Sequence, residues 1–186
     1  MTGGVPSHLR SRFAYLDSLD PSGVLPDPWR EVGVIHVGGL WHIGFADHTD
    51  LMLIISVSGR GLVDCATGTK IARDDREYFP ALGSLEAEGI GALENQPIRI
   101  AGIHGGALSR FSSDGWSVDL HPLSWPNEVL FLSPPDQGKI WTPEGVEAQL
   151  WKLPPLASSL VAFGFSPTGK SLVVATSSDV RIFHRG

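Results

Sequence analysis

The chain has a single cysteine, few charged residues and no long apolar run. Because Cys65 has no second cysteine to pair with, no disulfide can form within the chain, which fits a reducing compartment. Its position at the end of the apolar run Leu62–Cys65 predicts a buried structural thiol. The longest apolar stretch, Leu51–Val57, is far too short to cross a bilayer, and Met1–Pro6 lacks the pattern of a signal peptide. We therefore expect a cytoplasmic protein with no membrane contact.

Charge is scarce and its balance is acidic. Only 18% of the 186 residues are charged, and the formal net charge is -6. A nucleic-acid binder needs a basic surface to displace counterions, so nucleic acid is not an expected partner. By contrast, 42% of the residues are hydrophobic, and the chain contains 22 glycines and 14 prolines. This combination favours short buried strands joined by tight turns.

A helix is predicted only near the N-terminus. Within residues 7–19, Leu9, Phe13 and Leu16 recur at helical spacing, and Ser7 can cap the first turn. Asp20, Pro21, Ser22 and Gly23 end the pattern. The sequence thus predicts an N-terminal helix and connector over residues 1–30, followed by a single β domain over residues 31–186.

From residue 31 onward, short apolar segments alternate with polar or glycine-containing turns. Two groups of predicted strands have the same layout, in which a strand ends in glycine and phenylalanine, a turn follows, and an apolar strand returns. The first group comprises 32–37, 40–46, 51–57, 62–65 and 70–73. The second comprises 159–165, 171–176 and 180–183. A third copy is predicted around Phe111, where residues 111–118 parallel residues 165–172.

The segment Phe165–Phe183 resembles the inner half of a WD40-type β-propeller blade. It contains the turn FSPTGKSL, then ATSSD and VRIF, and the resemblance is strongest over residues 159–183. Residues 40–73 are similar to such a blade, and residues 98–132 share parts of the pattern. The chain departs from the family in lacking its Gly-His pair and its final Trp-Asp dipeptide. The resemblance implies a divergent WD40-like repeat protein of the all-β class, with about three four-stranded meander units after a short N-terminal helix.

Three such units are fewer than the four to eight blades of a propeller. A fourth blade could come from residues 84–91 and 139–153, two chains could form one ring, or the sheets could pack in an open arrangement. The C-terminal unit also ends after its third strand. We expect residues 32–37 to supply the missing strand, because that pairing would cover an open sheet edge.

Histidines provide the catalytic and metal-binding candidates. His36, His42 and His48 are spaced by six residues, but turns separate them, and a metal site would also need His104, Asp47 or Asp50. Ser109, His104 and Asp114 can be drawn as a triad, although no Gly-x-Ser-x-Gly turn is present. No metal or other cofactor is therefore expected, and no catalytic residue is assigned.

The sequence favours a non-enzymatic module that binds another protein or assembles with itself, as a homodimer for example. Tryptophans beside prolines in loops can anchor such an interface. The alternative is a small hydrolase or metal-binding enzyme that uses His42 and His104, together with Asp114. The candidate binding residues are Trp41, His42, His104, Trp116, Trp125 and Trp141.

Overall fold

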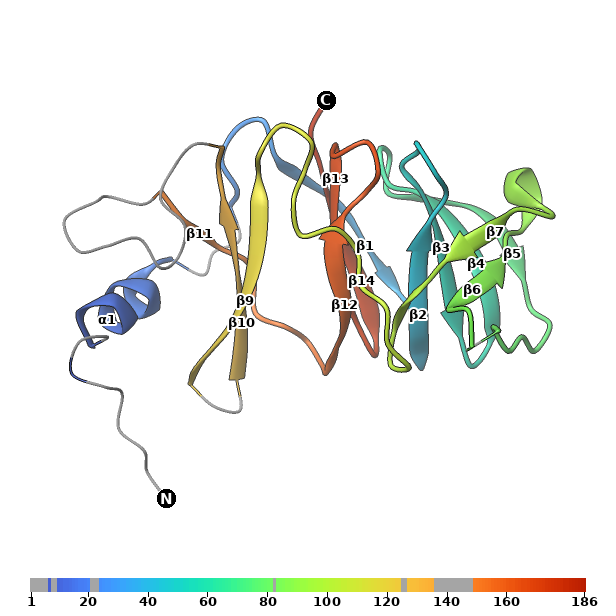
Figure 1. The fold of residues 1–186 in the computed structure, drawn as a ribbon, viewed down its shortest axis with the longest axis horizontal. Helices are drawn as coiled ribbons and strands as arrows, with labels where there is room; N and C mark the ends of the chain where they lie inside the picture. Colours follow the sequence, from blue (N-terminus) through green and yellow to red (C-terminus); the bar gives the residue numbers. More distant parts are fainter. Residues whose placement is uncertain (1–6, 8–9, 21–23, 82, 125–126, 136–148) are drawn as a thin grey trace, which may run out of the picture. The chain divides into compact units, whose positions relative to one another are not determined.

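The computed structural model describes residues 7, 10–20, 24–81, 83–124, 127–135 and 149–186. Antiparallel strands are the main regular structure of these residues (Figure 1), so the predicted all-β class is confirmed. The chain divides into two compact units, which are described separately. Met1–Leu25 and Gly115–Pro155 form the smaller unit, and Pro26–Asp114 and Leu156–Gly186 form the larger unit. The division into residues 1–30 and 31–186 stays a prediction.

The larger unit contains three sheets. The first has the order β5-β4-β3-β2-β8 and the second the order β1-β14-β13-β12, while β6 and β7 form a separate pair. The strands of the first sheet are β2 (Leu40–Phe45), β3 (Leu51–Ser56), β4 (Gly59–Asp64), β5 (Thr69–Asp74) and β8 (Ala101–Gly102). Those of the second are β1 (Arg30–His36), β12 (Leu160–Phe165), β13 (Ser171–Thr176) and β14 (Asp179–His184). The pair consists of β6 (Glu86–Glu88) and β7 (Pro97–Arg99), with the short 3-10 helix η2 (Gly91–Leu93) between them.

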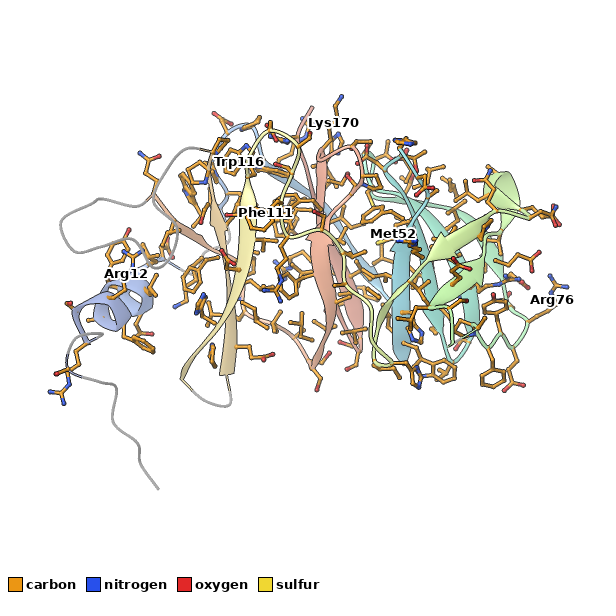
Figure 2. The ribbon with its side chains drawn as sticks, viewed as in Figure 1. Arg12, Met52, Arg76, Phe111, Trp116 and Lys170 are labelled. Carbon is orange, nitrogen blue, oxygen red and sulfur yellow. The ribbon has the colours of Figure 1, made fainter. Side chains whose placement is uncertain are left out.

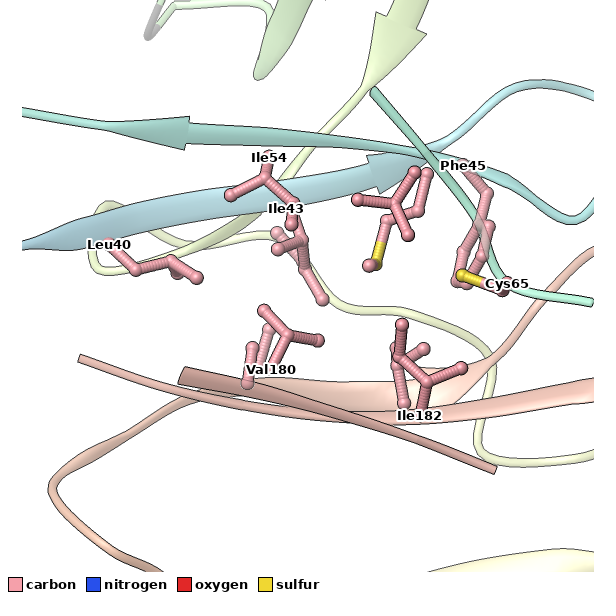
Figure 3. Packing of buried hydrophobic residues seen from close by; sticks show 13 residues of the cluster. Leu40, Ile43, Phe45, Ile54, Cys65, Val180 and Ile182 are labelled. Carbon is pink, nitrogen blue, oxygen red and sulfur yellow. The ribbon is translucent and has the colours of Figure 1, made fainter. Parts of the chain in front are cut away.

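The first two sheets bury their apolar faces in one core. Leu40, Ile43 and Ile54 face Val180 and Ile182 across this core (Figure 3). Cys65 is fully buried in the same cluster, which confirms the prediction of a buried thiol. Burial raises the pKa of Cys65 far above its usual range, and Asp50 and Asp64 add to that effect. The opposite face of the first sheet carries a second core of Leu53, Ile55 and Leu62, which side chains from residues 78–100 cover.

The two predicted repeats correspond at a constant offset of 120 residues. Phe45 pairs with Met52, as Phe165 pairs with Leu172. Each first strand has its irregularity at the same place, at Trp41 in β2 and at Val161 in β12. The hydroxyls of Ser56 and Thr176, which lie at matching positions, each accept a hydrogen bond from the amide two residues later. The shared register confirms the repeat that the sequence pattern predicts.

Matching glycines show why both repeats need a residue without a side chain. A Cβ atom on Gly44 would lie 2.2 Å from the carbonyl oxygen of Arg99, and one on Gly164 would lie 2.6 Å from that of Ser109. Each first strand is therefore approached closely by a segment from the region between the two repeats. Gly38, by contrast, has open space around its Cβ position. The glycine before each phenylalanine is thus required by packing against a neighbouring backbone.

The N-terminal strand completes the C-terminal repeat, as predicted. β1 pairs antiparallel with β14, with Val34 opposite Arg181 and Ile35 opposite Val180. A further backbone hydrogen bond, from Val37 to Ser178, extends the pairing. Segments from the two ends of the sequence are thus joined in one sheet.

The third repeat is incomplete, and the sheets differ in size. Phe111, which the repeat pattern places beside Phe45 and Phe165, is 54% exposed, whereas they are 7% and 2% exposed. Figure 2 labels Phe111 among the side chains of the described residues. The turn after it leads into β9 (Ser117–Ser124), but no strand lies between β8 and β9. The expectation of about three four-stranded units is met in part, because the sheets of the described residues have five, four, three and two strands, and Ser109 and Phe165 form an isolated bridge where a third first strand was expected.

In the smaller unit, α1 (Arg10–Ser18) packs near a three-stranded sheet. Its strands are β9, β10 (Asn127–Ser133) and β11 (Trp151–Lys152), with β10 in the centre. Leu16 of the helix is fully buried with Phe131 and Leu150. The predicted N-terminal helix is confirmed over Arg10–Ser18. Among the described residues, no helix has the length and apolar character needed to cross a membrane.

Residues 84–91 and 139–153 do not add a fourth blade in the part of the chain that is described. The first segment contains β6, which pairs with β7 in the larger unit, and the second contains β11. Residues 139–148 lie outside the described residues.

Candidate binding site

A bulge at the start of β2 positions the first two candidate residues. Leu40 pairs with Ser56 and His42 pairs with Ile55, so Trp41 is the extra residue between them. Bulges change the direction of a side chain relative to the regular alternation of a strand. Trp41 is partly exposed at this point, whereas His42 is fully buried. The sequence patterns at Leu40–Phe45 predict the strand but give no sign of the bulge.

A segment after β5 brings two aromatic rings to the same end of the sheet. Tyr78 lies over the guanidinium group of Arg60, 3.9 Å from it, and its hydroxyl accepts a hydrogen bond from Glu88. Arg60 also pairs with Asp74 at 2.6 Å. The next residue, Phe79, packs against Trp41 with ring centroids 5.9 Å apart. Tyr78 thus anchors the segment and leaves Phe79 beside Trp41.

The loop after β8 brings His104 to His42. Nδ1 of His104 lies 3.1 Å from Nε2 of His42. The ring centroids are 5.1 Å apart and the ring planes differ by 22°. The distance between the ring centroids exceeds the distance between the two nitrogens by nearly two ring radii. The two rings therefore lie almost end to end. This geometry is that of an N–H···N hydrogen bond in which the two nitrogens point at each other.

Burial makes His42 a poor base. Its pKa lies below the usual value, first because burial disfavours the charged form and second because of His104. Its other nitrogen, Nδ1, is buried and has no hydrogen-bond partner among the described residues. A bare acceptor nitrogen is less costly than an N–H group without an acceptor. We therefore assign the N–H of neutral His42 to Nε2, from which it donates to His104.

Three exposed apolar side chains lie at the same end of the sheet as Trp41. Phe79 is 67% exposed, Ile103 is 55% exposed and Val57 is 54% exposed. The amide of Ile103 donates to the carbonyl of Trp41, and the amide of Val57 donates to that of Gly39. We call Trp41, Val57, Phe79, Ile103 and the exposed His104 the Trp41 patch. Large exposed side chains gathered on a rigid sheet end are typical of an interaction surface.

The remaining predicted binding residues are Trp116, Trp125 and Trp141. Trp116 is 7% exposed in the smaller unit, where its ring lies 6.3 Å from that of Trp151. Trp116 is therefore packed within the smaller unit, and its role as a binding residue stays a prediction. Trp125 and Trp141 lie outside the described residues. Tryptophan content alone could not distinguish these positions, because the residue type serves cores and interfaces alike.

The drawn Ser-His-Asp arrangement does not form. The Asp114 carboxylate accepts two hydrogen bonds from Arg185, at 2.5 and 2.6 Å, and one from Ser112. These bonds hold the pKa of Asp114 at about 2, with Arg185 as the main cause. The hydroxyl of Ser109 donates to the carbonyl of Phe111. Asp114 and Ser109 are thus occupied by contacts of their own, and neither is bonded to His104.

Asp50 organises a polar cluster that the sequence did not reveal. Its carboxylate accepts hydrogen bonds from the hydroxyls of Ser166, Thr168 and Ser171 at 2.6 to 2.8 Å. Ser171 is also bonded to Nδ1 of His184 at 3.0 Å. The cluster joins the turn of the first repeat to the turn of the second. Because Ser171 is fully buried, we interpret the cluster as structural rather than catalytic.

His36 and His48 are exposed at separate places, so the three evenly spaced histidines do not form a site. In the described part of the chain, no group of three or more His, Cys, Asp or Glu side chains is arranged to hold a metal ion. Comparison with family models, curated proteins and solved structures found no significant match. The resemblance to WD40-type repeats therefore stays a prediction.

The buried histidines predict a loss of stability in mild acid. The pKa values of His42 and His184 are both lowered, mainly by burial, although Asp50 raises that of His184 in part. The unfolded chain therefore binds these protons more readily than the folded protein does. Stability from both groups is present above the unfolded value of about 6.5 and is lost as the pH falls below it.

Urea unfolding at pH 7.5 and pH 5.5 measures this effect. We expect a lower midpoint at pH 5.5, and a smaller difference between the two midpoints in a variant carrying His42→Leu and His184→Gln. A His36→Gln variant, altered at an exposed histidine, should behave like the unmodified protein. An equal pH difference in all three proteins would contradict the assignment.

Proposed function

We propose that this chain is a non-enzymatic protein-interaction module that binds through the Trp41 patch. The observation that carries the proposal is the position of Phe79, which is 67% exposed and packs on Trp41. Interface hot spots are enriched in aromatic side chains that are fixed before binding. Phe79 meets this condition, because neighbouring Tyr78 is held by Arg60 and by the Glu88 amide.

The partner is a protein surface, on another protein or on a second copy of this chain. The formal net charge of -6 argues against nucleic acid. Self-association through the edge of the first sheet is disfavoured. The edge strand β5 carries Lys70 and Arg73 and has a bulge at Ile71, and such features protect an edge from pairing with another strand. The Trp41 patch is therefore the preferred surface for either partner.

We further propose that the two matching repeats are propeller-type blades. Their support is the constant offset of 120 residues and the fourth strand that β1 adds to the second repeat. In this proposal the third repeat is incomplete, so the blades do not close into a propeller ring. A partner would complete that ring. The alternative of a hydrolase has less support, because Asp114 pairs with Arg185 and the nitrogens of His42 and His104 face each other.

A photo-crosslinking amino acid at the position of Phe79 tests the proposed surface. The full chain carrying benzoylphenylalanine at position 79 is irradiated in its native cells and compared with the same protein labelled at position 71. Ile71 is 49% exposed on the same sheet and serves as the matched control. We expect one discrete adduct from position 79 only, whose mass identifies either a second copy or another protein. No discrete adduct, or the same adduct from both positions, would refute the proposal.

A further inference from the structure

The loop that carries Ile103 and His104 is closed by two hydrogen bonds between Gly102 and Gly105 and is also bonded to β2. The Ile103 amide donates to the Trp41 carbonyl at 3.0 Å, and His104 bonds to His42 at 3.1 Å. Gly105 and Gly106 have φ values of 113° and 81°, a region that glycine occupies readily. The His42–His104 bond is thus a side-chain contact that helps to hold this loop against β2, and with it one side of the Trp41 patch.

The hydrogen bond between Nε2 of His42 and Nδ1 of His104 has room for one hydrogen atom between the two nitrogens. In the neutral pair, Nε2–H of His42 donates to the bare Nδ1 of His104. A proton added to Nδ1 of His104 would place two N–H groups head to head. The alternative shifts the His42 hydrogen to its buried Nδ1, which has no acceptor among the described residues. An unmade hydrogen bond of that kind shifts an equilibrium by about tenfold or more.

Rotation of the exposed His104 into water avoids both penalties. There it can carry a proton on each nitrogen, and His42 stays neutral in the sheet. Proton uptake and separation of the two rings are therefore coupled. We propose that the His42–His104 bond is a proton-sensitive latch, which releases residues 103–106 from β2 in mild acid and thereby weakens binding at the Trp41 patch. The effect on binding rests on the proposed function, but the release of the loop does not.

The other charged groups near His42 and His104 do not account for a pH response of this loop. On the same face, Ile55 lies opposite His42 on β3, and Arg60 follows on β4. Arg60 is already paired with Asp74 and lies two strands from His42. Asp75, Arg76 and Glu77 on the crossing segment are exposed, as is Arg99 on β7. His104 is accordingly the charge that acts on His42.

Hydrogen exchange of the loop amides tests the latch without any partner. Exchange of residues 102–106 in the full chain is followed at pH 7.5 and pH 5.0 and corrected for the intrinsic pH dependence of amide exchange. We expect protection of the Ile103 amide, which donates to the Trp41 carbonyl of β2, to fall by about tenfold or more at pH 5.0. The amides of β3, at the centre of the sheet, serve as an internal reference and should stay protected at both pH values.

Two variants separate the latch from a general effect of acid. His104→Asn cannot take up the proton, so its loop should show the same protection at both pH values. His36→Asn, altered at an exposed histidine of β1, should keep the response of the unmodified protein. Unchanged loop protection in the unmodified protein, or a pH response that persists in His104→Asn, would overturn the proposal. A negative crosslinking result at position 79 with a positive exchange result would refute the proposed function and leave the latch.

Discussion

Replacement of Asp50 with alanine is expected to lower the free energy of unfolding by about 3 kcal/mol or more. Asp50 accepts hydrogen bonds from three hydroxyls of the second repeat, on Ser166, Thr168 and Ser171. Hydrogen bonds to a charged group contribute about 1.5–3 kcal/mol each. Two of the three serine and threonine residues are buried, so removal of the carboxylate leaves their hydroxyls without this acceptor. Chemical denaturation measures the loss.

The neighbouring turn residue Asp47 provides the control for this prediction. Asp47 is exposed, so Asp47→Ala should change stability by no more than about 0.5 kcal/mol. Similar losses in the two variants would show that the cluster around Asp50 does not join the repeats.

Acid gives an independent measure of the same cluster. Burial alone would raise the pKa of Asp50, but hydrogen bonds from Ser166, Ser171 and Thr168 outweigh it and hold the pKa below its usual value. The stabilisation is thus complete above the unfolded value of about 3.9 and is lost as the pH falls below it. Asp50→Ala should lose this part of the acid sensitivity.

Proline at position 35 is expected to have the second large effect. The amide of Val37 donates to Ser178, and hydrogen-bonded pairs alternate along antiparallel strands. Ile35 is therefore hydrogen-bonded to Val180, its partner in the register, and Val34 is not bonded to Arg181. Ile35→Pro removes a ladder donor and leaves a carbonyl of β14 unpaired, at a cost of about 3 kcal/mol. Thermal or urea unfolding measures the change.

Val34→Pro is the matched control on the same strand. The amide of Val34 points away from β14, so proline there spares the ladder, and we expect a loss of about 1 kcal/mol. Equal effects at positions 34 and 35 would contradict the register. Small effects at both positions would contradict the pairing of the N-terminal strand with the C-terminal repeat.

The repeats were predictable because their signals are local. Gly44–Phe45 and Gly164–Phe165 each precede a polar turn and an apolar strand. This order of residues directly indicates a strand, a turn and a returning strand. The strand that β1 supplies was predictable by counting, because the second repeat lacked a fourth strand. The exposure of Phe111 was not predictable. Its turn has the right residues, but the partner that would bury it depends on contacts distant in sequence.

The site was predictable only in part. Trp41, His42 and His104 were singled out, and the structure brings them together. Phe79 was missed because residues 74–97 show no regular periodicity, and its role depends on the neighbouring contact between Tyr78 and Arg60. The Asp50 cluster was missed for a similar reason. The Asp50 carboxylate accepts hydrogen bonds from hydroxyl groups more than a hundred positions away. Nothing near Asp50 in the sequence indicates these partners.

The affinity for the partner trapped at position 79 tests the central claim most directly. It is measured by calorimetry for another protein, or by light scattering across a dilution series for a second copy. The account predicts that Phe79→Ser weakens binding by at least about tenfold, because a truncated aromatic anchor loses its contact area, and that Ile71→Ser leaves the affinity unchanged. Equal affinity in the unmodified protein and in Phe79→Ser would contradict the claim that this chain binds through the Trp41 patch.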